Sequence, residues 1–311
     1  MNIDLLFNQI ILMFGLMLVG VLTNKLKFLH EQTANDLTNI LLYIVSPCLI
    51  IKSFETPYSA SRVHIFLMIA LGTFILYLVQ IFLSSLIFKH VKDRNMRRIS
   101  KFSSVYSNAG FIGIPLVSSL FGSSGVFYAV VPLIFFNLFN WTHGISMFVT
   151  SKTEHSISQK FRKVLSNPNI IAIILGLNIF YFSIELPALL NQIIKYISSI
   201  NTPVSMFVIG NSLANISLKK CKLTRPIIIS LILRNIFYPL LTLIIMPLLG
   251  ISGLALSTII LMMACPVGGI VVLFTLQIHD NVSPAITLMG ISTLLSLITI
   301  PFIFFISNLF I

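Results

Sequence analysis

The chain has 311 residues, of which 57% are apolar, 11% aromatic and only 9% charged, and its net charge is +12. Soluble globular proteins contain roughly 25% charged residues, so this composition cannot cover a water-facing surface. It argues against a soluble enzyme and predicts an all-α polytopic membrane protein. A basic soluble protein would suggest a nucleic-acid partner, so the position of the charges decides what the +12 means.

Ten stretches are long and apolar enough to cross a membrane as helices, since a span needs about 20 mostly apolar residues. In chain order they are residues 5–23, 37–54, 63–88, 102–121, 124–149, 169–183, 187–216, 227–249, 254–277 and 282–306. The longest connections are residues 24–36, 89–101 and 150–168, which leave no room for a separate soluble domain.

The basic residues fall mainly in alternate connections. The connections after the first, third, fifth and seventh spans hold 16 of the 20 Lys and Arg residues. The positive-inside rule places these connections in the cytoplasm and both chain termini outside, in a plasma membrane. The connections are short and are not interleaved with aromatic residues, so we interpret the charge as an orientation signal and expect no nucleic-acid partner.

Ten spans divide into two halves of five, and an odd number gives the halves opposite orientations. We expect an inverted repeat of residues 1–150 and 169–311, joined by a basic cytoplasmic linker of residues 151–168. The fourth and ninth spans occupy matching positions, and both are interrupted, by Ser107-Asn-Ala-Gly-Phe-Ile-Gly-Ile-Pro115 and by Ala264-Cys-Pro-Val-Gly-Gly-Ile270. Single Gly and Pro residues are common in membrane helices, but clustered interruptions at matching positions indicate a transporter site.

All eight acidic residues fall in connections or at span ends, namely Asp4, Glu31, Asp36, Glu55, Asp93, Glu154, Glu185 and Asp280. A carboxylate at mid-membrane is expected in an intramembrane aspartyl protease, a proton relay or a cation pathway. Its absence favours a neutral or anionic substrate. The three cysteines, Cys48, Cys221 and Cys265, form no metal or redox motif, and we expect no catalytic residue, metal or cofactor.

Polar chemistry inside the spans comes from amides and one arginine. The candidates at the breaks and in the fifth span are Asn108, Ala109, Gly110, Gly113, Pro115, Asn137, Asn140, Cys265, Pro266, Gly268 and Gly269. Glycines allow close approach and prolines interrupt the helix. If the two breaks cross, the half-helices that begin there present N–H donors and positive dipole ends, which bind a carboxylate without a metal.

Arg234 is the strongest candidate for a functional ionisable residue inside the spans, either as a counter-charge for an anion or as a latch that stabilises one conformation. Its alternative is snorkelling to the cytoplasmic interface. We expect Lys52 and Lys195 to snorkel and His143 to be packed or solvated rather than a ligand.

These residues resemble a known family, the auxin efflux carriers and their bacterial relatives, over nearly the whole chain. The resemblance lies in Ser107 to Leu116, Asn167-Pro-Asn169, Thr202-Pro203, Gly210-Asn-Ser-Leu213, Arg234 followed by Pro239, Cys265-Pro266, and Ser292 to Pro301. It implies ten helices in two inverted repeats, with spans 4 and 9 crossing. It also implies a scaffold of spans 1, 2, 6 and 7, a transport unit of spans 3–5 and 8–10, homodimerisation through the scaffold and an elevator-like motion. This looks like the fold of bile-acid and sodium/proton carriers.

By the same resemblance, Asn108 matches an amide near the substrate carboxylate, Asn137 matches a substrate-contacting amide, and Ser46 lies near a second-helix contact. The chain departs from the plant pattern at Val272, where a second proline is expected, and in the short connection of residues 150–168. The bacterial relatives are commonly called malate or malonate permeases. We therefore expect a small organic anion, such as one of these acids or an auxin-like acid.

The sequence thus predicts a secondary carrier in the lipid bilayer that is not an enzyme. The alternatives are a sodium-coupled organic-anion symporter of the bile-acid type, a membrane receptor or assembly factor, and a membrane-embedded enzyme. Sodium dependence of transport distinguishes the sodium-coupled symporter. A receptor or assembly factor would keep its cellular phenotype when Asn108 is changed to Ala, so loss of the phenotype argues against it. For a membrane-embedded enzyme, the sequence offers no acid–base pair and no metal-binding cluster.

Overall fold

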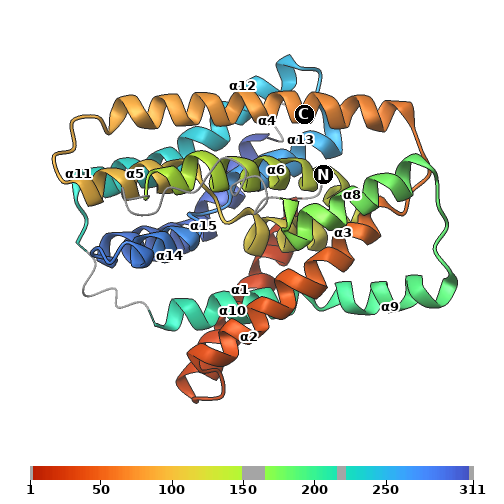
Figure 1. Ribbon diagram of the computed structural model, residues 1–311, viewed down its shortest axis with the longest axis horizontal. Coiled ribbons are helices and arrows are strands. Elements are labelled where there is room, and N and C mark those ends of the chain that lie inside the picture. The colour runs from red at the N-terminus through yellow and green to blue at the C-terminus, as the bar shows by residue number, and fades with distance from the viewer. Residues whose placement is uncertain (1–2, 149–164, 216–221, 308–311) are drawn as a thin grey trace.

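The structure is a computed structural model, and it describes residues 3–148, 165–215 and 222–307. Regular structure within these residues is helical, and four short π-helical segments are labelled η (Figure 1). In chain order the elements are α1 (Ile3–Lys25), α2 (Glu31–Ile40), η1 (Leu41–Val45), α3 (Ser46–Phe54), α4 (Ala60–Ile87), α5 (Arg94–Val105), η2 (Ala109–Gly113), α6 (Ile114–Phe139), η3 (Asn140–Gly144), α8 (Pro168–Tyr181), α9 (Ala188–Ser199), α10 (Asn201–Ala214), α11 (Arg225–Ile232), η5 (Leu233–Phe237), α12 (Tyr238–Leu248), α13 (Gly253–Ala264), α14 (Ile270–Gln277) and α15 (Ser283–Ser307).

Seven helical stretches of the described chain are long and apolar enough to cross a membrane. They are Asn8–Lys25, Gln32–Phe54, Ala60–Ile87, Ala109–Gly144, Ala188–Ala214, Arg225–Leu248 and Ser283–Ser307. Two shorter apolar helices, Pro168–Tyr181 and Gly253–Ala264, accompany them. The chain is therefore a multi-pass membrane protein, as its composition predicts.

The longest of these stretches contains a sharp bend at Gly122. This residue has φ 59° and ψ −155°, a conformation that glycine adopts far more readily than other residues. Two helical segments meet there, and α6 spans both of them. The bend lies where the sequence predicts the connection between the fourth and fifth spans.

Three of the π-helical segments end two residues before a proline. η1 lies before Pro47, η2 before Pro115 and η5 before Pro239. Proline has no N–H, and its ring clashes with the carbonyl four residues earlier, so a wider turn relieves the clash. The prolines thus explain why otherwise regular helices open at these points, and η5 is the segment that carries Arg234.

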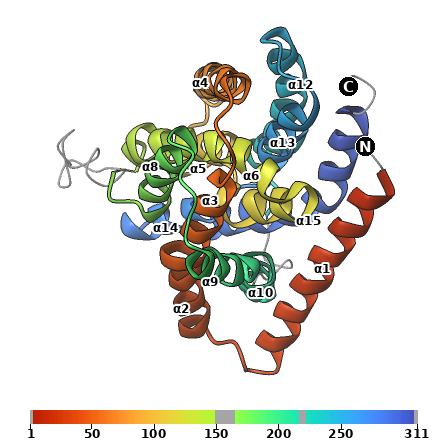
Figure 2. The same ribbon diagram turned by 90° about the vertical axis from the view of Figure 1, so that its right-hand side faces the viewer.

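Helices α1 and α10 lie side by side and approach very closely (Figures 1 and 2). A Cβ on Gly20 would lie 2.5 Å from the Phe207 carbonyl oxygen, and one on Gly210 would clash with the Met17 carbonyl oxygen. Near the end of the pair, the Asn24 amide donates to Asn211 Oδ1 at 2.7 Å. Two glycines therefore set the distance between these helices, and the hydrogen bond between the side-chain amides of Asn24 and Asn211 fixes their register.

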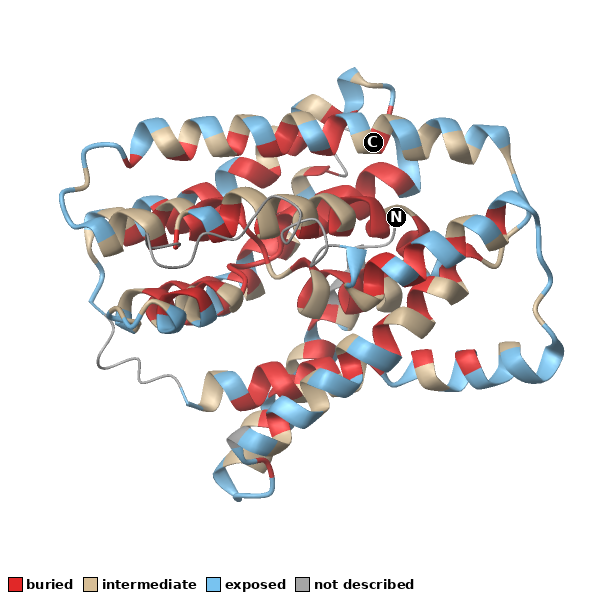
Figure 3. Cartoon of the chain, in the orientation of Figure 1, coloured by how far each residue is buried: buried red, intermediate tan, exposed pale blue. Residues whose placement is uncertain are grey.

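Buried residues concentrate on the central elements, whereas outward faces of α4 and α9 are exposed (Figure 3). Every residue from Ala255 to Ala264 in α13 is buried. Large apolar side chains face outward, such as Phe82 at 67% exposure and Leu189 at 72%. A surface this apolar is expected where helices contact lipid.

The α4–α5 and α14–α15 connections lie at one edge of the molecule, and the α3–α4 and α8–α9 connections lie at the opposite edge (Figure 1). The basic residues from Lys89 to Lys101 belong to the first edge. At the other edge, Lys52 donates from Nζ to Glu55 and to Asn191 at 2.5 Å each, while Lys195 is exposed. The basic linker of residues 151–164, together with Lys219, Lys220 and Cys221, lies outside the described residues.

Candidate functional site

Two helices end in extended backbone at the same place in the core. α5 ends at Val105 and α13 at Ala264, and the residues that follow, Tyr106 and Cys265, adopt extended conformations. The N–H of Asn108 donates to the Pro266 carbonyl at 2.7 Å, and the N–H of Gly268 donates to the Tyr106 carbonyl at 3.1 Å. The two breaks therefore cross and pair as a short antiparallel bridge between Ser107 and Val267, and this crossing is what the family resemblance implies.

Two glycines at the crossover, Gly268 and Gly113, lie where neighbouring atoms leave little room for a side chain. A Cβ on Gly268 would lie 3.1 Å from the Ser107 carbonyl oxygen. A Cβ on Gly113 would lie 2.8 Å from Met262 Sδ and 3.2 Å from Cys265 Sγ. At Gly268 the backbone of one break thus packs directly on the backbone of the other, whereas Gly113 packs against the side chains of Met262 and Cys265.

Helical structure resumes on the far side of each break. η2 begins at Ala109 and continues into α6, and α14 begins at Ile270. The first N–H groups of a helix have no intrahelical partner, and the positive end of the helix dipole lies there. Asn108 stands just before η2 and is partly exposed, and no hydrogen bond within the described chain uses its side-chain amide. Gly110 has open space above it, because a Cβ there would meet only Leu133 at 3.9 Å.

A serine on α15 supports the second break. Ser292 Oγ accepts a hydrogen bond from the Val267 N–H at 2.9 Å and donates to Asn235 Oδ1 at 2.7 Å. The Asn235 amide returns a bond to the Ser292 carbonyl at 3.0 Å. Ser292 belongs to the family-like motif from Ser292 to Pro301, and the sequence alone predicts no role for it. A hydroxyl at a buried span position opposite a broken helix is the signal that identifies it.

Arg234 lies beneath the crossover and is 1% exposed. Its Nη1 donates to the Val105 carbonyl at 2.8 Å, and its Nη2 donates to the Met263 carbonyl. The snorkelling alternative is therefore wrong, because the guanidinium is held by backbone carbonyls inside the protein.

The amides of the fifth predicted span do not join the crossover directly. Asn137 donates to the Leu133 carbonyl at 2.9 Å, and its Oδ1 accepts from Asn167 at 3.1 Å, so it is bonded to the residue that caps α8. Asn140 is fully buried, and neither polar atom of its amide has a hydrogen-bond partner among the described residues.

Three further residues named in the sequence, Pro115, Ser46 and His143, contact or neighbour the segments on either side of the crossover. The Pro115 carbonyl accepts from Thr202 at 3.3 Å, which joins the start of α6 to α10. Ser46 is buried at the start of α3, next to Val45, which packs with Phe111 of η2 in one apolar cluster. His143 is partly exposed, and its Nδ1 lies 2.9 Å from the Tyr106 hydroxyl.

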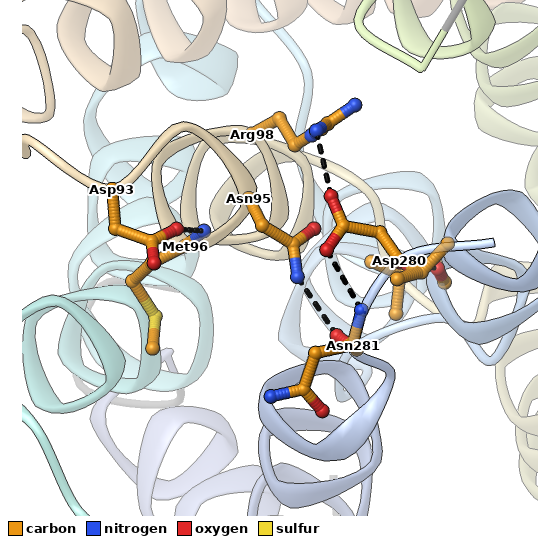
Figure 4. Close-up of polar contacts among 8 residues, drawn as sticks. Asp93, Asn95, Met96, Arg98, Asp280 and Asn281 are labelled. Atoms are coloured by element: carbon orange, nitrogen blue, oxygen red, sulfur yellow. Dashed lines mark hydrogen bonds and ion pairs between the residues drawn. The ribbon is translucent and has the colours of Figure 1, made fainter. Parts of the chain in front are cut away.

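Polar contacts join the outer ends of the two interrupted spans (Figure 4). Arg98 on α5 pairs with Asp280 in the α14–α15 connection at 2.8 Å, and the Asn95 amide donates to the Asn281 carbonyl at 2.8 Å. Burial lowers the pKa of the Arg98 guanidinium, and the charge of Asp280 acts in the opposite direction. Asp93 caps α5 by accepting from the Met96 N–H at 2.7 Å. α5 and α14 are thus held together at both ends.

Comparisons with known proteins identify the family of the chain. Residues 5–166 and 154–304 match the family described as "Membrane transport protein". An uncharacterized transporter of Methanocaldococcus jannaschii is 26% identical over 219 residues, which are 68% of this chain and 70% of that one. A protein of Rhizobium meliloti named "Putative malonate transporter" is 24% identical over 215 residues, 67% of this chain and 66% of that one. The chain belongs to the membrane transport protein family, that of the auxin efflux carriers and their bacterial relatives.

Proposed function

We propose that this protein is a secondary carrier for a small organic anion of the malonate or malate type, which binds at the crossover. The observation that carries the proposal is the paired break, from which η2 and α14 both begin. Two helix N-termini offer N–H donors and positive dipole ends to one anion. The amide of Asn108 lies beside them without a partner in the described chain. The name of the Rhizobium meliloti relative suggests the substrate class.

The proposed architecture has ten spans in two inverted halves, residues 1–150 and 169–311. Counting the bent stretch at Gly122 as two spans, and adding α8 and the α13–α14 pair, brings the seven long stretches to ten. The scaffold would consist of α1, α2–α3, α8 and α9–α10, where α1 packs on α10 and α3 on α8 and α9. The remaining helices would form the transport unit of an elevator-type carrier that is a homodimer.

The proposed orientation places the α4–α5 edge in the cytoplasm of a plasma membrane and both termini outside. The basic residues of that edge support it through the positive-inside rule. The start of α1 and the end of α15 lie near each other in both ribbon views, which supports a common side for the termini (Figures 1 and 2).

Transport by purified protein tests the function. We expect proteoliposomes to take up labelled malonate or malate, with lactate and indole acetate as comparison substrates. Robust transport of an inorganic cation without transport of any carboxylate would contradict the proposal.

Replacing Asn108 by Ala tests the site. A hydrogen bond to a charged group contributes about 1.5–3 kcal/mol, so we expect uptake to fall roughly ten- to hundredfold. The control is Asn178→Ala, because Asn178 is exposed on α8 and bonds only within its own helix, to the Ile174 carbonyl. Equal uptake by both variants would remove Asn108 from the site.

A sodium-coupled symporter is the second candidate. The observation that favours it is the meeting of two helix C-termini at the crossover, since carbonyls at such ends bind Na⁺ in other carriers. Arg234 already donates to one carbonyl at each of these ends, so this candidate comes second. Dependence of the uptake rate on Na⁺ decides between the two candidates.

A further inference from the structure

Two negative helix ends face each other below the crossover. α5 and α13 are each 12 residues long, and both stop abruptly in extended backbone. The last carbonyls of a helix have no intrahelical N–H partner, and the dipole gives that end about half an elementary negative charge. Together the two ends contribute roughly one negative charge inside the membrane.

Arg234 is the group that meets this charge. One guanidinium nitrogen donates to Val105, the last residue of α5, and another to Met263, the penultimate residue of α13. The side chain is 1% exposed. The ion pairs of the described chain are Lys52 with Glu55 and Arg98 with Asp280, so no carboxylate of these residues neutralises Arg234.

The charges therefore balance locally. A buried cation without compensation is strongly unfavourable, and two half charges from the helix ends match the single positive charge of the guanidinium. The planar guanidinium group can bridge the two helix ends, because its separate N–H groups donate to two carbonyls at once. Little of this positive charge is left for a substrate on the other side of the crossover.

We propose that Arg234 is a built-in cation that occupies the position where a monovalent cation would otherwise bind between the two helix C-termini. In the carrier of the proposed function, on which this inference rests, Arg234 is a positioning residue that holds the crossover and does not touch the substrate. A permanently attached cation needs no loading from solution, so anion transport proceeds without coupling to sodium or potassium.

The unmodified protein gives the first test. Carboxylate uptake into proteoliposomes is measured with Na⁺, with K⁺, and with both replaced by N-methylglucamine at matched membrane potential. We expect rates that agree within about twofold. A loss of tenfold or more without Na⁺ or K⁺ would overturn the inference, whereas failure to transport any carboxylate in all three media would overturn the proposed function instead.

The second test removes the cation. Arg234→Ala should lose about tenfold or more in uptake and become responsive to small cations. Adding millimolar guanidinium, or adding Na⁺ when no guanidinium is present, should restore at least part of the uptake rate and raise the melting temperature of the variant. Arg225→Ala is the matched control, since Arg225 is exposed at the start of the same helical stretch. We expect no cation response from the control or from the unmodified protein.

The third test uses a conservative variant, which decides the matter if Arg234→Ala does not fold. Arg234→Lys keeps the charge but has a single ammonium group, so we expect a stable carrier with reduced uptake that is still independent of Na⁺ and K⁺. Sodium-dependent uptake by Arg234→Lys, or a tenfold change in substrate KM at unchanged maximal rate, would contradict a positioning role and indicate direct contact with the anion.

Discussion

At the scale of single residues, the crossover depends on atoms that glycine and proline lack. Gly268 has no Cβ, which lets its backbone pair with the Tyr106 carbonyl at 3.1 Å. Pro266 has no N–H, and its carbonyl is the acceptor for Asn108. Each residue therefore removes something that would either clash or need a partner inside the membrane.

Gly268→Ala should damage the site directly. The added Cβ would lie 3.1 Å from the Ser107 carbonyl oxygen, and that backbone is held in the bridge. Overpacking of this kind costs about 1–3 kcal/mol, so we expect a lower unfolding temperature in detergent and weaker uptake. The control is Gly15→Ala, where nothing lies within 4 Å and alanine favours the helix. An unfolding temperature and an uptake rate unchanged from the parent protein would show that the bridge can relax.

The sequence predicts where the backbone breaks, because Gly and Pro restrict the backbone wherever they occur. The partners of Arg234 were not predictable in the same way. Its acceptors are the carbonyls of Val105 and Met263, and a carbonyl has no sequence signature. The contact of Asn137 with Asn167 was missed for a different reason, since helical spacing shows which face a residue occupies but not which helix lies opposite.

At the scale of elements, α1 and α10 pack backbone to backbone at two glycines. Gly20 and Gly210 meet at the contact, with the Asn24–Asn211 bond further along. Small residues of this kind let helix backbones pack closely in a membrane, where apolar side chains gain little by leaving lipid. The sequence predicts both spans, but not their pairing, since residues of the two helices are nearly two hundred positions apart.

Gly210→Ala should separate this pair. The methyl group would clash with the Met17 carbonyl oxygen, so we expect a loss of about 1–3 kcal/mol in stability with little change in substrate KM. The measurement is thermal unfolding in detergent, combined with uptake at several substrate concentrations. Ser212→Ala on the same helix is the control, since its hydroxyl bonds only to the Val208 carbonyl of α10. A raised KM with unchanged stability would instead connect this contact to substrate binding.

At the scale of the whole molecule, charge and connectivity agree. The α4–α5 connection and the first turns of α5 carry a run of basic residues, and the ion pair of Arg98 on α5 with Asp280 joins this edge to the α14–α15 connection. A partly exposed pair contributes only about 0–1 kcal/mol, so it identifies neighbours rather than stabilising the fold. The bend at Gly122 and the division between α13 and α14 fall where the sequence predicts them. Other boundaries were harder to predict, because α5 already begins at Arg94, ahead of the predicted fourth span, and the seventh predicted span is divided into α9 and α10.

Cysteine labelling tests the proposed orientation. In a background with Cys48→Ala and Cys221→Ser, where Cys265 stays fully buried, single variants Lys92→Cys and Glu185→Cys place one thiol at each edge. We expect a membrane-impermeant maleimide to label Glu185→Cys on intact cells and Lys92→Cys only after permeabilisation. The reverse pattern would invert the topology.

The contacts of Arg234 also constrain how the protein is made. Its acceptors lie 129 residues earlier and 29 residues later in the chain. When the segment Arg225–Leu248 enters the bilayer, the second acceptor has not yet been inserted. An arginine at the centre of an inserting helix costs about 2.5–3.5 kcal/mol on translocon scales, which the surrounding apolar residues must offset. The carbonyl of Val105 is then the partner that is already present, so the first half of the chain assists insertion of the second.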